Sequence, residues 1–185
     1  MRHRKMKEFD DDFDEKEGGV EPVLLIPPEL HSMETDKPFT HCVDCSREMV
    51  ESFEEYMVQK AVHRGETIFE FALCTECHDE VRQGFSKETV LRLNQYFGLQ
   101  ELDDEGLHGC LDCGRRRDDA VSYTMAGSCY GPFLATGMMI CSECQANIQD
   151  LISEQTRKGW DDWVGRTFPC APESEDVPTK RPMLL

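Results

Sequence analysis

Two stretches of the chain alternate in side-chain type with a period of two. In residues 67–73, Phe69 and Phe71 share one face of an extended chain, and in residues 121–125, Tyr123 and Met125 do the same. This period, in β-branched and aromatic residues, predicts β-strands. Residues 53–62 can supply a partner strand to the first stretch through a turn at 63–66. In the second, the pattern predicts a turn at 127–132 and a return strand over 133–140, broken near Gly137. We therefore expect two β-hairpins.

After each hairpin the apolar period changes to that of a helix. Val81 and Phe85 lie four positions apart, and Leu93 and Phe97 repeat this spacing, with Ser86 between them as a candidate helix cap. The later part of the chain shows the same period, through Ile148, Leu151, Ile152, Trp160, Trp163 and Val164. These apolar stripes predict helices that pack against the hairpins or against each other.

The chain contains an internal repeat. The segment His41–Arg47 resembles Gly109–Arg115 at an offset of 68, and Leu73–Cys77 resembles Ile140–Cys144 at an offset of 67. The later offset persists through the helical pattern, and a one-residue deletion between the two segments explains the change. We interpret the repeat as a duplicated unit of about 60 residues, because such units are supersecondary structures that recur along a chain.

Each repeat carries two C-x-x-C pairs. The stretch between Cys45 and Cys74 in the first repeat is only one residue longer than the stretch between Cys113 and Cys141 in the second. Two intervening residues let a tight turn aim both sulfurs at one point, and two such turns make the tetrahedral four-sulfur site that zinc favours. The spacing predicts two structural zinc ions per chain. Their ligands would be Cys42, Cys45, Cys74 and Cys77 at one site, and Cys110, Cys113, Cys141 and Cys144 at the other.

The order of these parts resembles the treble-clef class of zinc domains. In that class a zinc knuckle and a β-hairpin precede a helix whose first turn carries the second ligand pair. The resemblance covers residues 40–98 and 108–166 at the level of architecture. Cys113-Gly114 matches the usual glycine of the knuckle, whereas Cys45-Ser46 departs from it. The resemblance implies an α+β fold made of two tandem copies of this small zinc-binding unit.

The remaining segments flank or join the two units. Residues 1–38 combine charge runs with prolines and predict a disordered acidic region. Within it, the apolar run Val23–Ile26 predicts either an edge strand or a docking segment. We place the first unit at 39–98, an acidic linker at 99–107, the second unit at 108–169 and a flexible tail at 170–185. His41, His78 and His108 adjoin the cysteine pairs, but a closed four-sulfur site does not need them. Cys129 and Cys170 are left over and are interpreted as free thiols.

Charge narrows the classes of function. Thirty-seven acidic residues against 20 basic ones give a formal charge of −17. This balance disfavours a general nucleic-acid binder, which needs a basic face. No apolar run approaches the length of a membrane span of about 20 residues. An acidic run at residues 10–17 stands where a secretion signal would carry its apolar core, so we expect a cytoplasmic protein.

Four functions remain open at this point. We expect a non-catalytic, zinc-stabilised adaptor or regulatory protein that binds a protein partner, for which a basic one would suit the charge. The main alternative is a nucleic-acid-binding zinc finger that uses Arg115–Arg117, although Asp118 and Asp119 follow at once. A remote alternative is rubredoxin-like electron transfer through iron. An enzyme is disfavoured because four cysteines close the coordination shell that catalytic zinc keeps open. The oligomeric state stays open.

Overall fold

Two β-hairpins of equal length form the centre of the structure. The first joins β2 (Glu55–His63) to β3 (Glu66–Cys74), and the second joins β4 (Ser122–Tyr130) to β5 (Phe133–Cys141). The computed structural model describes residues 24–98 and 104–169. Both predicted hairpins are present, but the second turn is shorter than predicted. Gly127 lies within β4. A Cβ at this position would lie 2.6 Å from the Leu30 side chain, so the glycine makes room for packing and does not mark a turn.

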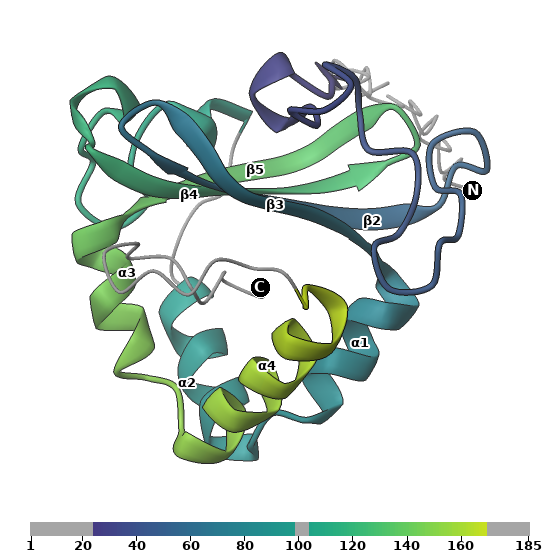
Figure 1. Cartoon of the computed structure of the whole chain (residues 1–185). Helices are drawn as coiled ribbons and strands as arrows, with labels where there is room; N and C mark the ends of the chain where they lie inside the picture. Colours follow the sequence, from purple (N-terminus) through teal and green to yellow (C-terminus); the bar gives the residue numbers. More distant parts are fainter. Residues whose placement is uncertain (1–23, 99–103, 170–185) are drawn as a thin grey trace, which may run out of the picture.

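The two hairpins belong to one sheet. Its strands are antiparallel, in the order β1-β5-β4-β2-β3 (Figure 1). The central pair is β2 with β4, and in its register Gln59 lies opposite Ala126. The sequence separation of these two positions equals the later offset of the repeat. Each residue of β2 therefore pairs with a residue of β4 whose repeat counterpart also lies in β2. The register therefore has two-fold pseudosymmetry, centred between Gln59 and Ala126.

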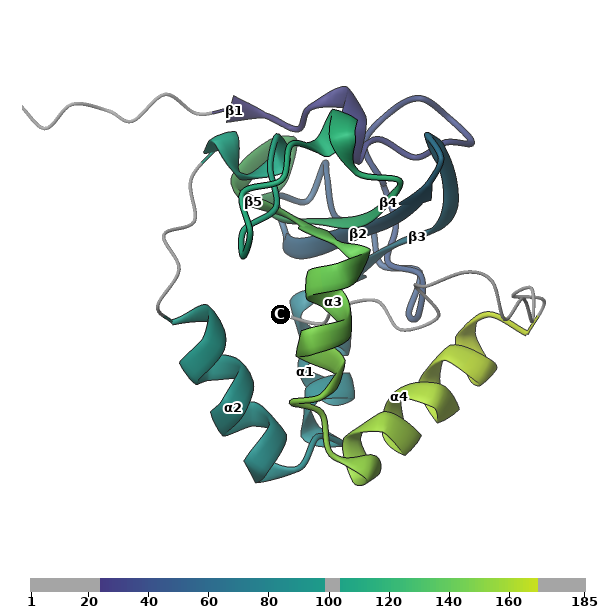
Figure 2. The same ribbon diagram turned by 90° about the vertical axis from the view of Figure 1, so that its left-hand side faces the viewer.

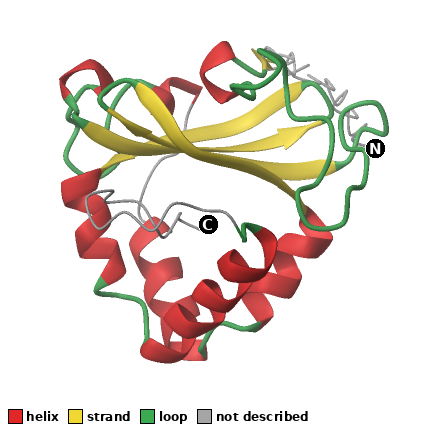
Figure 3. Ribbon diagram, in the orientation of Figure 1, coloured by secondary structure: helices red, strands yellow, loops and turns green. Residues whose placement is uncertain are grey.

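Four helices cover one face of the sheet (Figures 1 and 3). They are α1 (Thr75–Gln83), α2 (Lys87–Phe97), α3 (Ser142–Gln149) and α4 (Glu154–Thr167). Ser86 caps α2 as predicted, by accepting a hydrogen bond from the backbone N–H of Thr89, and Ser153 caps α4 in the same way. None of the helices in the described ranges is both long and apolar enough to cross a membrane.

The longer helix that follows each hairpin contacts the other half of the chain. In α4, the ring of Trp163 lies 5.5 Å from that of Phe71 in β3, and Phe168, which follows α4, lies 4.7 Å from Phe69. Figures 1 and 2 show α4 beside α1, and α2 beside α3. The two halves of the chain thus exchange helices and share one core, an arrangement that the period of the sequence does not reveal.

The N-terminal segment crosses the sheet face opposite the helices. Strand β1 (Leu24–Leu25) pairs with β5 at the sheet edge, and the 3-10 helix η1 (Pro28–Leu30) buries Leu30 completely. The structure differs here from the expectation of disorder over residues 1–38, since residues 24–38 are ordered against the sheet. Of the two interpretations of Val23–Ile26, the structure shows the edge strand for Leu24 and Leu25. Residues 1–23 and 170–185 lie outside the described residues.

A buried ion pair fastens this segment. Lys60 and Glu70 approach to 3.1 Å with nearly buried side chains. Glu70 also accepts hydrogen bonds from the Ser32 hydroxyl, at 3.1 Å, and from the Met33 N–H, at 2.9 Å. Because an unpaired buried carboxylate is costly, these contacts hold the segment in register across β2 and β3.

The predicted linker is also partly structured. The 3-10 helix η2 (Asp104–Leu107) lies on β5, and Leu107 is buried there. Gly137 of β5 lies beneath the Leu107 side chain, which an added Cβ would meet at 2.9 Å. Another 3-10 helix, η3 (Arg117–Asp119), precedes β4. Residues 99–103 are not among the described residues.

Candidate metal centres

Two clusters of four cysteines lie at the junctions between a loop, a hairpin and a helix. In each cluster, all four sulfur atoms lie within 4.8 Å of one another. The first contains Cys42 and Cys45 from the loop before β2, Cys74 at the end of β3 and Cys77 in the first turn of α1. The second contains Cys110, Cys113, Cys141 and Cys144. The structure thus brings together the eight cysteines that spacing selected, in the two groups expected.

The loop that carries the first pair has the same backbone in both halves. The Cys42 N–H donates to the Arg47 carbonyl at 2.8 Å, and the Cys110 N–H donates to the Arg115 carbonyl at 2.8 Å. The residue after the second cysteine has a positive φ in each loop, 60° at Ser46 and 70° at Gly114. Only glycine adopts this conformation without steric cost, so Ser46 keeps the knuckle geometry with some strain.

Each loop is also tied to the strand beside it. The Val43 N–H donates to the Ala72 carbonyl at 2.9 Å, and the Leu111 N–H donates to the Met139 carbonyl at 2.8 Å. This bond brings the first cysteine pair against the end of the hairpin, where the second pair begins. The sheet therefore sets the distance between the two halves of each cluster.

The second pair of each cluster lies at a helix N-terminus. Cys74 is the N-cap of α1 and Cys141 that of α3, and neither helix has a side-chain hydrogen bond at its cap. Thiolates are stabilised there by free N–H groups and by the positive end of the helix dipole. This placement follows from the sequence, since a C-x-x-C pair that starts a helix puts both thiols on its first turn.

Burial and backbone N–H groups act in opposite directions on these thiols. Burial opposes ionisation of Cys110, but N–H groups of Cys113, Cys141 and Asp112 outweigh it and lower the pKa of Cys110 to about 7. The pKa of Cys42 is lowered by the corresponding groups, against the same effect of burial. Burial instead raises the pKa of Cys77 and of Cys144, each beside the other thiols of its cluster. Each cluster thus has one thiol whose pKa is lowered by backbone N–H groups and at least one whose pKa is raised by burial.

One sulfur–sulfur distance in each cluster matches the edge of a tetrahedral metal site. A tetrahedron with metal–sulfur bonds of about 2.3 Å has edges of about 3.8 Å. Cys45 and Cys74 lie 3.7 Å apart, and Cys113 and Cys141 lie 3.8 Å apart, measured between sulfurs. Three of the four cysteines in each cluster are buried, and one is exposed. Four soft thiolates at this spacing suit zinc, and they also suit iron.

An ion pair links the loop to the helix at each cluster. Arg47 pairs with Glu76 at 2.5 Å, and Arg115 pairs with Glu143 at 2.6 Å. Each arginine lowers the pKa of its glutamate through this contact. The matched pairs join the residue two positions after one C-x-x-C motif to the residue between the cysteines of the other.

Sequence reasoning missed one set of contacts at the clusters. Asp44, between Cys42 and Cys45, accepts a hydrogen bond from the Trp163 indole at 3.4 Å and lies 3.5 Å from Arg166. Trp163 belongs to the other half of the chain. In the second loop, Asp112 lies near Tyr96, which belongs to the opposite half of the chain. Burial is the main cause of the raised pKa of Tyr96, and the Asp112 carboxylate adds to it. The signal for this contact was an aspartate at the same position in both loops.

The other candidate residues lie outside the clusters. His41 lies 2.9 Å from the Thr40 hydroxyl, His78 lies beside Asp79, and His108 belongs to a shallow surface depression with Arg116. Cys129 is buried in β4, and Cys170 lies outside the described residues. Comparisons with protein-family models, curated proteins and solved structures found no match to this chain.

Proposed function

We propose that each cysteine cluster binds one zinc ion that serves a structural purpose. The sulfur–sulfur distances of 3.7 and 3.8 Å carry this proposal, since they match the edges of a zinc–thiolate tetrahedron. Four cysteines fill such a shell and leave no position for substrate, which supports a non-catalytic role. The recurrence of elements at an offset of 67 supports a duplicated unit of the treble-clef type.

Zinc would supply much of the stability of this fold. Each repeat contributes two strands and two α-helices, a small core for its length. Structural zinc contributes on the order of 10 kcal/mol per site in zinc-finger peptides. The thiols with raised pKa values, Cys77 and Cys144, favour ionisation only when a cation is present.

Metal analysis of the gently purified full chain tests this proposal. We expect two zinc ions per chain, and one in the Cys77→Ser variant or the Cys144→Ser variant. Cys129→Ala serves as the control, because Cys129 belongs to neither cluster, and it should keep both ions. A stoichiometry below one zinc ion would contradict the proposal. Stoichiometric iron with a red colour would instead favour the rubredoxin-like alternative.

The role that we propose for the folded protein is to bind a protein partner, as an adaptor or regulator in the cytoplasm. Ionising four thiols and adding one Zn²⁺ changes the charge of each site by −4 + 2 = −2, so filling both sites takes the formal charge from −17 to −21. A surface this acidic favours a basic partner and repels nucleic-acid phosphates.

The nucleic-acid alternative rests on Arg115–Arg117. Two of these arginines are paired within the chain, Arg115 with Glu143 at 2.6 Å and Arg117 with Glu29 at 3.3 Å. These ion pairs reduce the positive charge that phosphates would meet. Titration of the zinc-loaded protein into a labelled DNA duplex at low salt distinguishes the two functions. We expect no binding, whereas affinity that falls steeply with salt would favour the alternative.

A further inference from the structure

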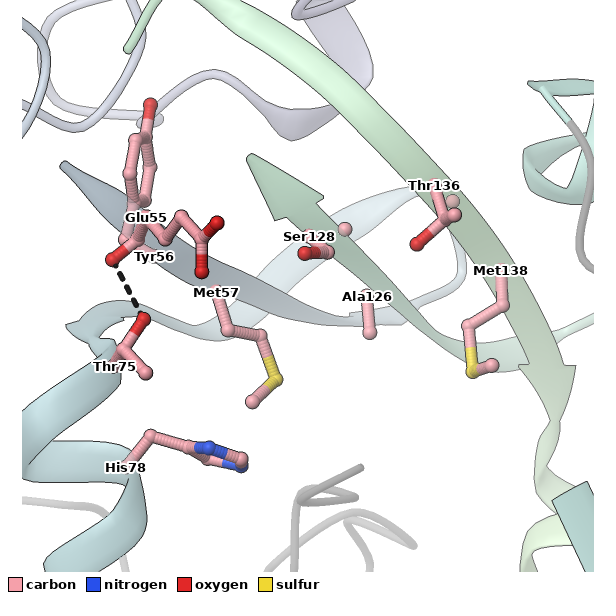
Figure 4. Close-up of a pocket in the computed structure, with 11 residues that line it drawn as sticks. Glu55, Tyr56, Met57, Thr75, His78, Ala126, Ser128, Thr136 and Met138 are labelled. Carbon is pink, nitrogen blue, oxygen red and sulfur yellow. Dashed lines mark hydrogen bonds between the residues drawn. The ribbon is translucent and has the colours of Figure 1, made fainter. Parts of the chain in front are cut away.

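A pocket of about 270 Å³ lies on the helix side of the sheet, and two of its lining residues, Thr75 and His78, adjoin Cys74 and Cys77 of the first cysteine cluster. Its floor comes from β2, β4 and β5, and α1 forms one wall (Figure 4). Figure 4 shows the Met57 and Met138 side chains extending from the sheet on the side where His78 of α1 lies. The Glu55 side chain stands at the rim and is exposed.

The pseudosymmetric position in the other half is filled by aromatic rings. Phe69 and Phe71 stand there, 67 positions before Thr136 and Met138 of the pocket. The rings of Trp163 and Phe168 close this stack, with centroids 5.5 Å from Phe71 and 4.7 Å from Phe69, respectively. Replacing two phenylalanines by threonine and methionine thus leaves a pocket where the other half has a ring-filled core.

The contact between sheet and helix also differs between the pocket and the filled half. In the filled half, the Thr124 hydroxyl donates to the Gln145 side-chain oxygen at 3.0 Å, which ties sheet to helix. The counterparts of these residues in the pocket are Met57 and His78. Met57 cannot form a tie of equal strength, because a thioether is only a weak acceptor. Methionines are adaptable and make favourable contacts with aromatic rings, so they suit a pocket that accepts one.

Charge indicates what would flank such a ring. Glu55 makes no ion pair within the part of the chain that the structure describes, and the whole chain is strongly acidic. A cation next to an inserted ring would meet this carboxylate at the rim. Rim charges of this kind act mainly on partner choice and association.

We infer that this pocket binds an aromatic side chain of a partner protein, presented on a segment with an adjacent basic residue. The inference rests on the proposed protein-binding role and does not depend on the identity of the metal. The inserted ring would complete, from outside, the aromatic packing that Phe69, Phe71 and Phe168 provide in the other half.

Methyl NMR of the zinc-loaded full chain, labelled at methionine, tests this inference. The probe is a capped peptide, Gly-Arg-Gly-Phe-Gly, titrated to millimolar concentration. We expect ring-current shifts at the Met57 and Met138 methyls, and none from the peptide with alanine in place of phenylalanine. Glu55→Gln should weaken binding about two- to fivefold at low salt.

A filled-pocket variant provides the matched control. Thr136→Phe combined with Met138→Phe restores the residues of the other half and should abolish binding while the fold is kept. Thr136→Val, which adds no ring, should still bind. Equal shifts in the filled variant, or no shifts in the natural chain, would overturn the inference. Two zinc ions per chain without peptide binding would leave the zinc proposal standing and contradict the pocket inference. Peptide binding by a chain without zinc would contradict the zinc proposal and leave the pocket inference standing.

The chain itself supplies a competing occupant. Outside the described ranges, its aromatic residues are Phe9 and Phe13. Nuclear Overhauser contacts from the Met138 methyl to either ring in the peptide-free protein would show an internal ligand and would refute a partner site. Loss of those contacts in a Phe9→Ala, Phe13→Ala variant would identify the same outcome.

Discussion

The hydroxyl oxygens of Ser86 and Ser153 lie 2.8 Å apart, although the two residues are 67 positions apart in the chain. Each serine caps its own helix, and each backbone N–H donates to a threonine of the other half. Ser86 donates to Thr156 and Ser153 donates to Thr89, both at 2.9 Å. Four hydroxyl groups thus join the starts of α2 and α4 on the pseudosymmetry axis.

Replacing either serine by alanine should therefore weaken both halves. Ser86→Ala and Ser153→Ala each remove a cap and should lower the free energy of unfolding by about 1 kcal/mol. The double variant should lose less than the sum, because the first change already breaks the shared contact. Urea unfolding of the three variants measures this. Losses that simply add, within the error of the measurement, would show that the two caps act independently.

The positive φ of Ser46 makes the first knuckle improvable. Ser46→Gly should stabilise the zinc-loaded protein by about 0.5–1 kcal/mol, since glycine adopts φ 60° without steric cost. Gly114→Ser is the matched reverse change and should destabilise by a similar amount. Denaturant midpoints of the two variants check the signs. A loss of stability in Ser46→Gly would mean that the serine side chain contributes more than its conformation costs.

Loss of one metal site should loosen both halves of the chain. Cysteine spacing alone suggests that Cys77→Ser unfolds its own unit more than the other. The shared sheet and exchanged helices instead predict that amide protection falls in β4 and α4 as well as in β2 and α1. Hydrogen exchange of the Cys77→Ser variant, with Cys144→Ser as its counterpart, distinguishes these outcomes. Protection that stays native in the intact half would support independent units.

Burial of Cys129 should make stability decline at high pH. Burial raises the pKa of the Cys129 thiol to about 12, against 9.0 when exposed. Between these values the unfolded chain loses a proton that the folded chain keeps, so stability falls as pH rises from 9 to 12, by at most about 1.4 kcal/mol per pH unit. Cys129→Ala should flatten this decline in urea unfolding of zinc-loaded protein. An unchanged slope would assign the decline to other groups.

Two glycines should respond oppositely to alanine. At Gly106 an added Cβ would clash with the Gly137 carbonyl oxygen, so Gly106→Ala should destabilise by about 1–3 kcal/mol. At Gly165 in α4 nothing lies within 4 Å of such a Cβ, so Gly165→Ala should stabilise by up to about 1 kcal/mol. Thermal unfolding compares the two, and a tolerated Gly106→Ala would show that η2 can move away from β5.

Local features of this fold could be predicted from sequence, and long-range ones could not. Alternation around Phe71 and Tyr123 revealed the hairpins, and the C-x-x-C spacing grouped the eight cysteines, because these signals act over a few residues. The pairing of Gln59 with Ala126 depends on two strands far apart in the chain. The placement of α4 depends on the packing of Trp163 against Phe71, which lies far away in the chain. Likewise, the sequence around Leu30 shows no periodic pattern, and the burial of Leu30 depends on a sheet formed by distant residues.

The register of β2 on β4 has a consequence for assembly. Each half pairs with the other through the same edge of the corresponding strand, as the subunits of an isologous dimer do. A half-chain cut between the two units would carry a complete cysteine set and an unpaired β2 edge. Two identical half-chains would satisfy that edge in the same register, so this single chain holds the geometry of a symmetric homodimer within one polypeptide.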